Sequence, residues 1–328
     1  MFFAYDTPAI RYTGRWGEEQ NRITATAAGA YFEFVFTGKL ATIHFDLSLQ
    51  SEPYPHLWVS VDGGARVEST LSPFVRVQAC KEGLHTVCVI LKGSVEMQHR
   101  WYQPLVARVS LLGIEADDLS ELAEDTRKTI EFVGDSITEG VMIDESCRVY
   151  QEEYWNRPFQ DDVCATYAWL TAERLNLRPY MMGYGAVGTT KSGCGAVPRA
   201  GEAYPFNFDR SPVSFPEPDY IVISHGTNDM RASAEDYCEQ YRGLLDVVRR
   251  VHPHSKIIAL SAFYGVHAEA LRALVGQYNQ EHGTDVAFIN GSGWVPREPV
   301  HPLRGGHEII AERLCNELEK ILYGSDLD

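Results

Sequence analysis

The first part of the chain alternates apolar and polar residues with the period of β-strands. The clearest runs lie at residues 31–36, before a Thr-Gly turn, and at residues 57–61, before Asp-Gly-Gly. Similar short runs follow one another to about residue 116, and turn residues separate them at close intervals. This pattern is typical of an all-β sandwich, and we predict a jelly-roll domain over residues 1–118.

Beyond residue 128 short apolar runs alternate with longer stretches of helical period. The runs lie at 130–133, 180–182, 220–224, 257–261 and 286–289, and the helical stretches at 166–175, 234–251, 268–282 and 307–322. Such alternation predicts a five-stranded parallel sheet between two layers of helices. The predicted fold is therefore α/β, with an N-terminal jelly-roll sandwich, a charged linker at 119–128 and a three-layer αβα domain at 129–328.

The length of the chain agrees with two globular domains, and its net charge disfavours some classes of partner. A chain of 328 residues is long for one domain and comfortable for two. The formal net charge of -16 disfavours binding to nucleic-acid phosphates or to anionic lipid. No apolar run has the length of a membrane span, and residues 1–12 lack the pattern of a signal peptide. We predict a cytoplasmic protein with no nucleic-acid or membrane partner, and make no prediction of its oligomeric state.

The cysteines and histidines give no pattern of a metal site. The seven cysteines are odd in number and scattered, without CxxC spacing, so we expect free thiols. HExxH is absent, and the histidines at 252 and 254 form one isolated pair. We therefore predict that the protein uses neither a metal nor a cofactor.

A candidate nucleophile stands at the end of the first strand of the second domain. In TIEFVGDSITEG the apolar run stops at Gly134, and Asp135 and Ser136 follow before a stretch that begins a helix. A side chain at the carboxyl end of a parallel strand lies at the crevice where open α/β sheets bind ligands. The alternative is a purely structural turn in which the Asp or Ser caps the helix.

Three other strand ends carry glycine-rich or polar sequences. They are GYGAVGTT at 183–190, HGTND at 225–229 and REPVHP at 297–302. Glycines allow backbone N–H groups to approach a ligand closely. A nucleotide-binding turn is the alternative for the first segment, but it lacks the Walker A signature and a clear acidic ribose partner. We expect the three segments to surround Ser136, because the carboxyl ends of parallel strands meet at one edge of the sheet.

These residue types fit acyl transfer by a serine. A serine hydroxyl needs an adjacent base, for which His301 is the candidate. The oxyanion of the tetrahedral intermediate needs preorganised donors, and we assign the Ser136 and Gly188 N–H groups and the Asn228 side-chain amide. The imidazole needs an acceptor that fixes its orientation, and Glu298 is the nearest carboxylate in sequence.

The four segments resemble the sequence blocks of the SGNH, or GDSL, hydrolase superfamily. The resemblance covers residues 129–328 and implies the same roles for Ser136, Gly188, Asn228 and His301. Two positions depart from the usual pattern of that superfamily. The second block begins with Gly183 instead of Asn, and the acid before the histidine is Glu298 instead of Asp.

A jelly roll ahead of such a hydrolase domain is similar to carbohydrate esterase family two, whose members remove acetyl groups from plant polysaccharides. The motifs in the first domain are RWG at 15–17, VDG at 61–63 and GLHTV at 83–87. In that family a backbone carbonyl can replace the acid. Either Glu298 or a backbone carbonyl is therefore expected to orient His301.

The expected activity is that of a serine esterase that removes O-acetyl groups from sugars or oligosaccharides through an acetyl-enzyme on Ser136. Loops at the active face shape specificity, and we predict that Tyr154 and Trp155 line a sugar-sized cleft. The alternative is that their loop only packs on the neighbouring domain. Two other functions remain open: a GDSL-type lipase or acyl-thioesterase, and a carbohydrate-binding protein without activity.

Overall fold

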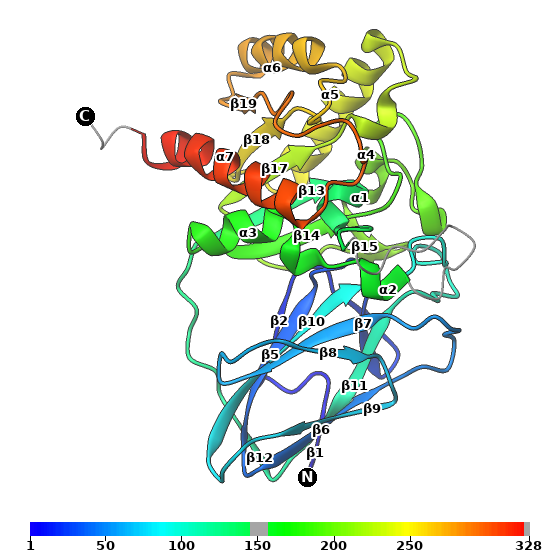
Figure 1. Cartoon of the computed structure of the whole chain (residues 1–328), viewed down its shortest axis with the longest axis vertical. Helices are drawn as coiled ribbons and strands as arrows, with labels where there is room; N and C mark the ends of the chain where they lie inside the picture. Colours follow the sequence, from blue (N-terminus) through cyan, green and yellow to red (C-terminus); the bar gives the residue numbers. More distant parts are fainter. Residues whose placement is uncertain (145–156, 325–328) are drawn as a thin grey trace.

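Two antiparallel sheets pack face to face in the N-terminal part of the chain (Figure 1). The computed structural model describes residues 1–144 and 157–324. One sheet has the strand order β3-β4-β11-β6-β9 with β1 beside β11, and the other β12-β5-β10-β7-β8 with β2 beside β5. The strands are β1 (Phe2–Ala4), β2 (Ile10–Thr13), β3 (Gly17–Glu19), β4 (Arg22–Ala25), β5 (Tyr31–Thr37), β6 (Leu40–Phe45), β7 (His56–Val61), β8 (Val67–Thr70), β9 (Phe74–Gln78), β10 (Leu84–Gly93), β11 (Val109–Glu115) and β12 (Asp118–Ser120).

Alternating side chains of these strands fill the space between the two sheets. Phe32, Phe34 and Phe36 of β5 are buried there, as the period of two predicts. Trp16 and Trp101 are also buried, so neither offers an exposed ring for stacking on a sugar. The predicted all-β sandwich is therefore confirmed as the N-terminal part of the fold.

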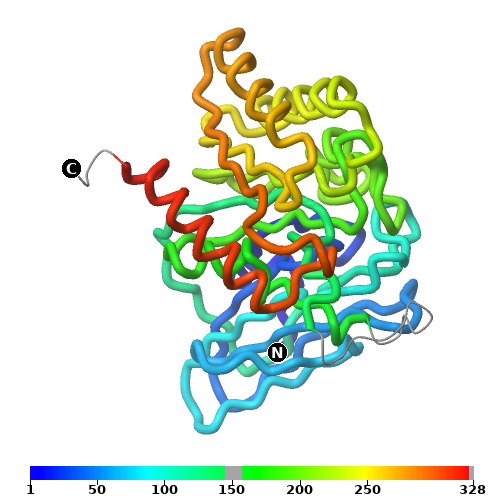
Figure 2. The backbone as a smooth tube through the Cα atoms, turned by 45° about the horizontal axis from the view of Figure 1, so that its top comes forward, coloured from blue at the N-terminus to red at the C-terminus, as the bar shows by residue number. Residues whose placement is uncertain are grey.

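A parallel five-stranded sheet forms the second domain, as predicted. Its order is β14-β13-β17-β18-β19, and its strands are β13 (Thr129–Gly134), β14 (Arg178–Gly183), β17 (Tyr220–Ser224), β18 (Lys256–Leu260) and β19 (Ala287–Ile289). Side chains of α5 (Ala234–Val251) and α6 (Ala268–His282) cover one face of the sheet. Those of α3 (Tyr167–Arg174) and α7 (Arg304–Tyr323) cover the other. Figure 2 shows α7, in red, apart from α5 and α6, in yellow and orange.

Shorter elements fill the loops of this domain. They are α1 (Ser136–Glu139), α2 (Arg157–Gln160), η3 (Val163–Ala165), η4 (Cys194–Ala196), α4 (Ala200–Ala203), β15 (Phe206–Phe208), β16 (Ser211–Pro212) and η5 (Thr227–Asp229). Each cysteine in the described ranges is a free thiol. Within the same ranges, no helix combines the length and apolar character needed to cross a bilayer.

Two buried arginines of the N-terminal domain form ion pairs with the second domain. Their partners are glutamates that precede and follow Ser136 in the chain. Arg15 Nη2 lies 2.8 Å from Glu131 Oε1 on β13, and both side chains are fully buried. Arg100 forms a bidentate ion pair with Glu139 on α1, and its Nη2 donates to Oε2 at 3.1 Å. The connection between the domains is short, since β12 ends at Ser120 and β13 begins at Thr129.

Candidate active site

The turn after β13 places Ser136 at the carboxyl edge of the parallel sheet. Asp135 caps α1, since its Oδ1 accepts the Ile137 N–H at 3.0 Å. A Cβ atom on Gly134 would lie 2.1 Å from Thr138 Oγ1, so this position requires glycine. The turn is therefore tight, and Ser136 becomes the first residue of the helix.

The loops that follow β13, β14 and β17 begin at the same level of the sheet. Gly134 is in register with Gly183 on one side and with Ser224 on the other. A Cβ atom on Gly183 would lie 2.4 Å from the backbone nitrogen of Glu139. The approach of α1 thus accounts for glycine where the superfamily usually has asparagine.

His301 lies beside Ser136, although 165 positions separate them in the chain. The imidazole Nε2 is 2.9 Å from Ser136 Oγ. His301 is half-buried in the loop between β19 and α7. This distance is within the range in which a base removes the proton of a serine hydroxyl, so the pair has the geometry of an activated nucleophile.

Asn228 and Gly188 also lie at this edge of the sheet. The Asn228 side-chain amide donates to the Val187 carbonyl at 3.0 Å and to Asp135 Oδ2 at 3.3 Å. The Gly188 N–H donates to the Lys191 carbonyl at 3.1 Å. An oxyanion bound by these donors would have to replace those acceptors, and the oxyanion role of Ser136, Gly188 and Asn228 stays a prediction.

Two aspartates hold the loops around Ser136. The Asp229 carboxylate accepts the backbone N–H of Thr189 at 3.1 Å and that of Thr190 at 2.8 Å. A Cβ atom on Gly188 would lie 2.5 Å from Asp229 Oδ1, so glycine permits this close approach. Burial raises the pKa of Asp135 to about 7, although the hydrogen bond from the Ile137 N–H lowers it. Asp135 therefore places less than a full negative charge beside the nucleophile at neutral pH.

Glu298 lies in the same loop as His301, between β19 and α7. Glu298 is exposed, and within the described residues its carboxylate forms no hydrogen bond or ion pair with that imidazole. The assignment of Glu298 or a backbone carbonyl as the partner of His301 stays a prediction. Tyr154 and Trp155 lie outside the described residues, so their proposed contact with a sugar also stays a prediction.

Two further histidines of the second domain are buried, and one of them holds a backbone N–H of α3. His307 Nδ1 accepts the Tyr167 N–H at 2.9 Å, and burial is the main cause that lowers its pKa to about 3. Burial also lowers the pKa of His225 to about 4. Both imidazoles are therefore neutral at pH 7.

His307 should make the protein less stable in mild acid. Its pKa is about 3 in the folded state and about 6.5 in an unfolded chain, so the unfolded state binds its proton first as the pH falls. The free energy of unfolding is therefore lowered as the pH falls below about 6.5, and this histidine accounts for a loss of about 2 to 3 kcal/mol at pH 4.5. We expect the melting temperature of His307→Asn to decrease less between pH 7.5 and pH 4.5 than that of the wild type.

This comparison needs thermal unfolding curves of both proteins at the two pH values. The asparagine Oδ1 is bonded to Cγ as Nδ1 is in histidine, so it can still accept the Tyr167 N–H, which limits the packing loss common to both pH values. Equal decreases in the two melting temperatures would contradict the assignment of a neutral, buried His307.

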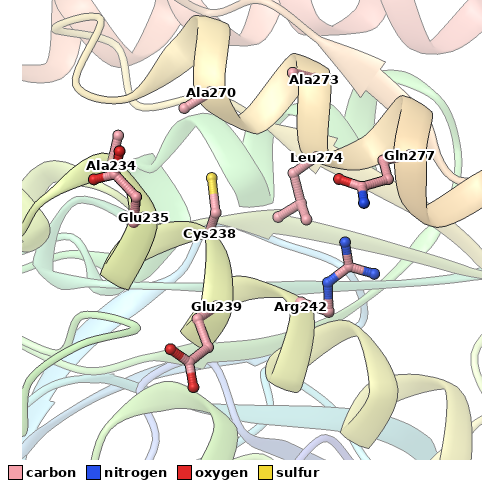
Figure 3. A pocket seen from close by; sticks show the side chains of 9 residues that line it. All are labelled: Ala234, Glu235, Cys238, Glu239, Arg242, Ala270, Ala273, Leu274 and Gln277. Carbon is pink, nitrogen blue, oxygen red and sulfur yellow. The ribbon is translucent and has the colours of Figure 1, made fainter.

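A hollow of the second domain lies between α5 and α6 and not at the strand ends. Its volume is about 350 Å³, and Figure 3 shows Cys238 and Leu274 among the side chains that line it. Burial raises the pKa of Cys238, which keeps the sulfur protonated and weakly nucleophilic. We therefore assign the nucleophile of acyl transfer to the edge of the sheet and not to this hollow.

Comparisons with known proteins give a family match and a related protein. Residues 132–309, more than half of the chain, match the GDSL-like Lipase/Acylhydrolase family. The curated protein Cellulase/esterase CelE of Acetivibrio thermocellus is 26% identical over 97% of this chain. The chain spans only 40% of the length of CelE.

Solved structures with the same two-domain fold cover nearly the whole chain. A family two carbohydrate esterase from Cellvibrio japonicus has a TM-score of 0.80 at 20% identity, over 98% of this chain and 97% of that one. A family two carbohydrate esterase from Clostridium thermocellum, in complex with cellohexaose, has a TM-score of 0.75 at 22% identity, over 96% and 99%. An acetyl xylan esterase from Butyrivibrio proteoclasticus has a TM-score of 0.78 at 18% identity, over 99% of both chains. These similarities establish the fold that the sequence predicts.

Proposed function

Because the chain belongs to the GDSL-like Lipase/Acylhydrolase family, we propose that it is a serine esterase that removes acetyl groups from acetylated sugars or oligosaccharides. The observation that carries the proposal is the 2.9 Å contact between Ser136 Oγ and His301 Nε2 at the edge of the sheet. The names of the relatives, a cellulase/esterase and an acetyl xylan esterase, support a carbohydrate ester as substrate. A neutral substrate also suits a chain with a net charge of -16.

In the proposed reaction, His301 Nε2 accepts the proton of Ser136 Oγ while that oxygen attacks the acetyl carbonyl carbon. The carbonyl oxygen becomes an oxyanion, for which the Ser136 and Gly188 N–H groups and the Asn228 amide are the proposed donors. The bond to the sugar oxygen breaks, and the imidazolium returns its proton to that oxygen. Water activated by His301 then attacks the acetyl-enzyme, which releases acetate and restores the Ser136 hydroxyl.

The acyl specificity can be tested with p-nitrophenyl esters of increasing chain length. We expect kcat/KM to be highest for acetate and to fall as the acyl chain grows. The leaving group is the same throughout, so the series reports only the fit of the acyl group. A preference for long chains would instead favour a lipase or acyl-thioesterase.

The sugar specificity requires a second measurement, acetate release from acetylated xylo-, manno- and gluco-oligosaccharides. We expect release from at least one of these series. Absence of any ester hydrolysis, together with absence of labelling by a fluorophosphonate, would contradict the proposed function and favour a non-catalytic carbohydrate-binding protein.

A further inference from the structure

Asp162 is a buried carboxylate that accepts hydrogen bonds from three parts of the molecule. Its Oδ1 accepts the Cys164 N–H at 3.0 Å and the Trp58 indole N–H at 2.9 Å. Its Oδ2 accepts Nη2 of Arg304 at 3.0 Å. Trp58 belongs to β7 of the sandwich and Arg304 begins α7, so one side chain of the loop before α3 joins both domains.

The backbone of Asp162 packs against the end of the helix that Ser136 begins. The Asp162 N–H donates to the Gly140 carbonyl at 3.0 Å. Gly140 ends α1 with a φ of 87°, and a Cβ atom there would lie 2.6 Å from the Asp162 carbonyl oxygen. The nucleophile helix and Asp162 are therefore held at a fixed distance from each other.

The Asp162 carboxylate acts on the loop of the base through Arg304, three residues after His301. Its partner Arg304 also lies 3.5 Å from Asp144, and the Arg304 N–H donates to the Ile143 carbonyl at 3.2 Å. The Arg304 side chain is 48% exposed, whereas that of Asp162 is only 4% exposed. Burial therefore restricts the Asp162 side chain, and its carboxylate restrains the more exposed Arg304 side chain.

We infer that Asp162 is a positioning residue that sets the distance between Ser136 Oγ and His301 Nε2. Its backbone holds the nucleophile helix and its carboxylate holds the start of α7, directly after the loop that carries the base. A displacement of about 1 Å between reacting groups costs up to about 100-fold in rate. This inference deepens the proposed esterase function and rests on it.

The kinetic test uses Asp162→Asn and Arg304→Gln with p-nitrophenyl acetate. Asparagine keeps an acceptor oxygen for Cys164 and Trp58 but loses the charge that faces Arg304. We expect kcat to fall about 10- to 100-fold in each variant, while KM changes less than about twofold, because the base is misplaced but the substrate site is intact. Since both changes break the same contact, the double variant should be no slower than the slower single variant.

A matched control breaks a different ion pair of α7, which joins it to α3. Glu308 of α7 pairs with Arg174 of α3 at the surface, and neither contacts Ser136 or His301 among the described residues. Glu308→Gln should leave kcat unchanged. Melting temperatures of all variants show whether a loss of rate is a loss of fold.

Hydrogen exchange tests the anchoring without any activity measurement. The amides of Arg304, Gly306 and His307, which donate backbone hydrogen bonds where the His301 loop meets α7, should exchange faster in Asp162→Asn and Arg304→Gln than in the wild type and Glu308→Gln, with α5 unchanged in all four proteins. A wild type that hydrolyses no ester would contradict the proposed function. The exchange data would still decide whether Asp162 anchors the loop, because they require no activity. Unchanged exchange, or faster exchange with an unchanged kcat in an active enzyme, would overturn the inference.

Discussion

Replacing Ser136 with alanine should lower kcat for p-nitrophenyl acetate by roughly 10⁴- to 10⁶-fold. The substitution removes the only atom of Ser136 that can form the acetyl-enzyme, and leaves His301 with no hydroxyl from that residue to deprotonate. The backbone N–H at position 136 remains, so any residual rate would reflect binding and oxyanion stabilisation alone. The melting temperature should change little, because a single oxygen is removed.

Labelling by a fluorophosphonate gives an independent measure of the same serine. The wild type should gain the mass of one adduct, and Ser136→Ala should gain none. Ser292→Ala, in the loop after β19, is the control and should keep both labelling and turnover. His301→Ala should lose a similar fraction of the rate, and combining it with Ser136→Ala should cost little more, since the two residues act as a unit. Retained turnover in Ser136→Ala would refute the nucleophile assignment.

The sheet and the meeting of Ser136 with His301 were predictable because their signals are local. Apolar runs marked the five strands, and each candidate side chain lies in a segment between the end of a strand and the next long helix. Parallel strands bring such ends to one edge of a sheet, so residues 165 positions apart were expected to meet. Glu298 shows the limit of this argument, since closeness to His301 in sequence does not decide which acceptor orients the imidazole.

The start of the last helix was predicted three residues late for a local reason. The sequence indicated residue 307, whereas α7 begins at Arg304 and continues through Gly305 and Gly306. Glycines are weak helix formers, so Gly305 and Gly306 give no helical signal in the sequence. A Cβ atom on Gly306 would lie 2.9 Å from Pro302 Cβ, so this glycine allows the loop of His301 to pack on the helix.

The buried ion pairs between the domains had no local signal of this kind. Arg100 and Glu139 are 39 positions apart, and Arg15 and Glu131 are 116 positions apart. Pairing over such distances depends on how the two domains pack, which hydrophobic periodicity does not describe. One hint was present: Glu131 is a charged residue inside an apolar strand, and a charge buried there requires a partner.

Replacing Arg100 with methionine should lower the free energy of unfolding by about 3 to 5 kcal/mol, because the buried carboxylate of Glu139 would lose the cation that pairs with it. Both side chains of this pair are almost fully buried, and the guanidinium also lies 5.0 Å from the ring centroid of Tyr184. Burial raises the pKa of Glu139 and Arg100 opposes that rise, so the pKa should be higher still in Arg100→Met. A carboxyl whose pKa is raised by folding loses stability as the pH rises, and the variant should therefore be weaker at pH 8 than at pH 5, relative to the wild type.

Urea unfolding of the whole chain at both pH values measures this loss. Arg100→Met combined with Glu139→Gln should recover much of it, because removing both charges leaves none buried alone. The exposed pair of Arg242 and Glu281 between α5 and α6 provides the control, and Arg242→Met should cost less than about 1 kcal/mol. A double variant as unstable as Arg100→Met would contradict the electrostatic explanation and leave lost packing as the cause. Because Glu139 lies on the helix that begins with Ser136, recovery of stability with reduced kcat would show that Arg100 also places the nucleophile.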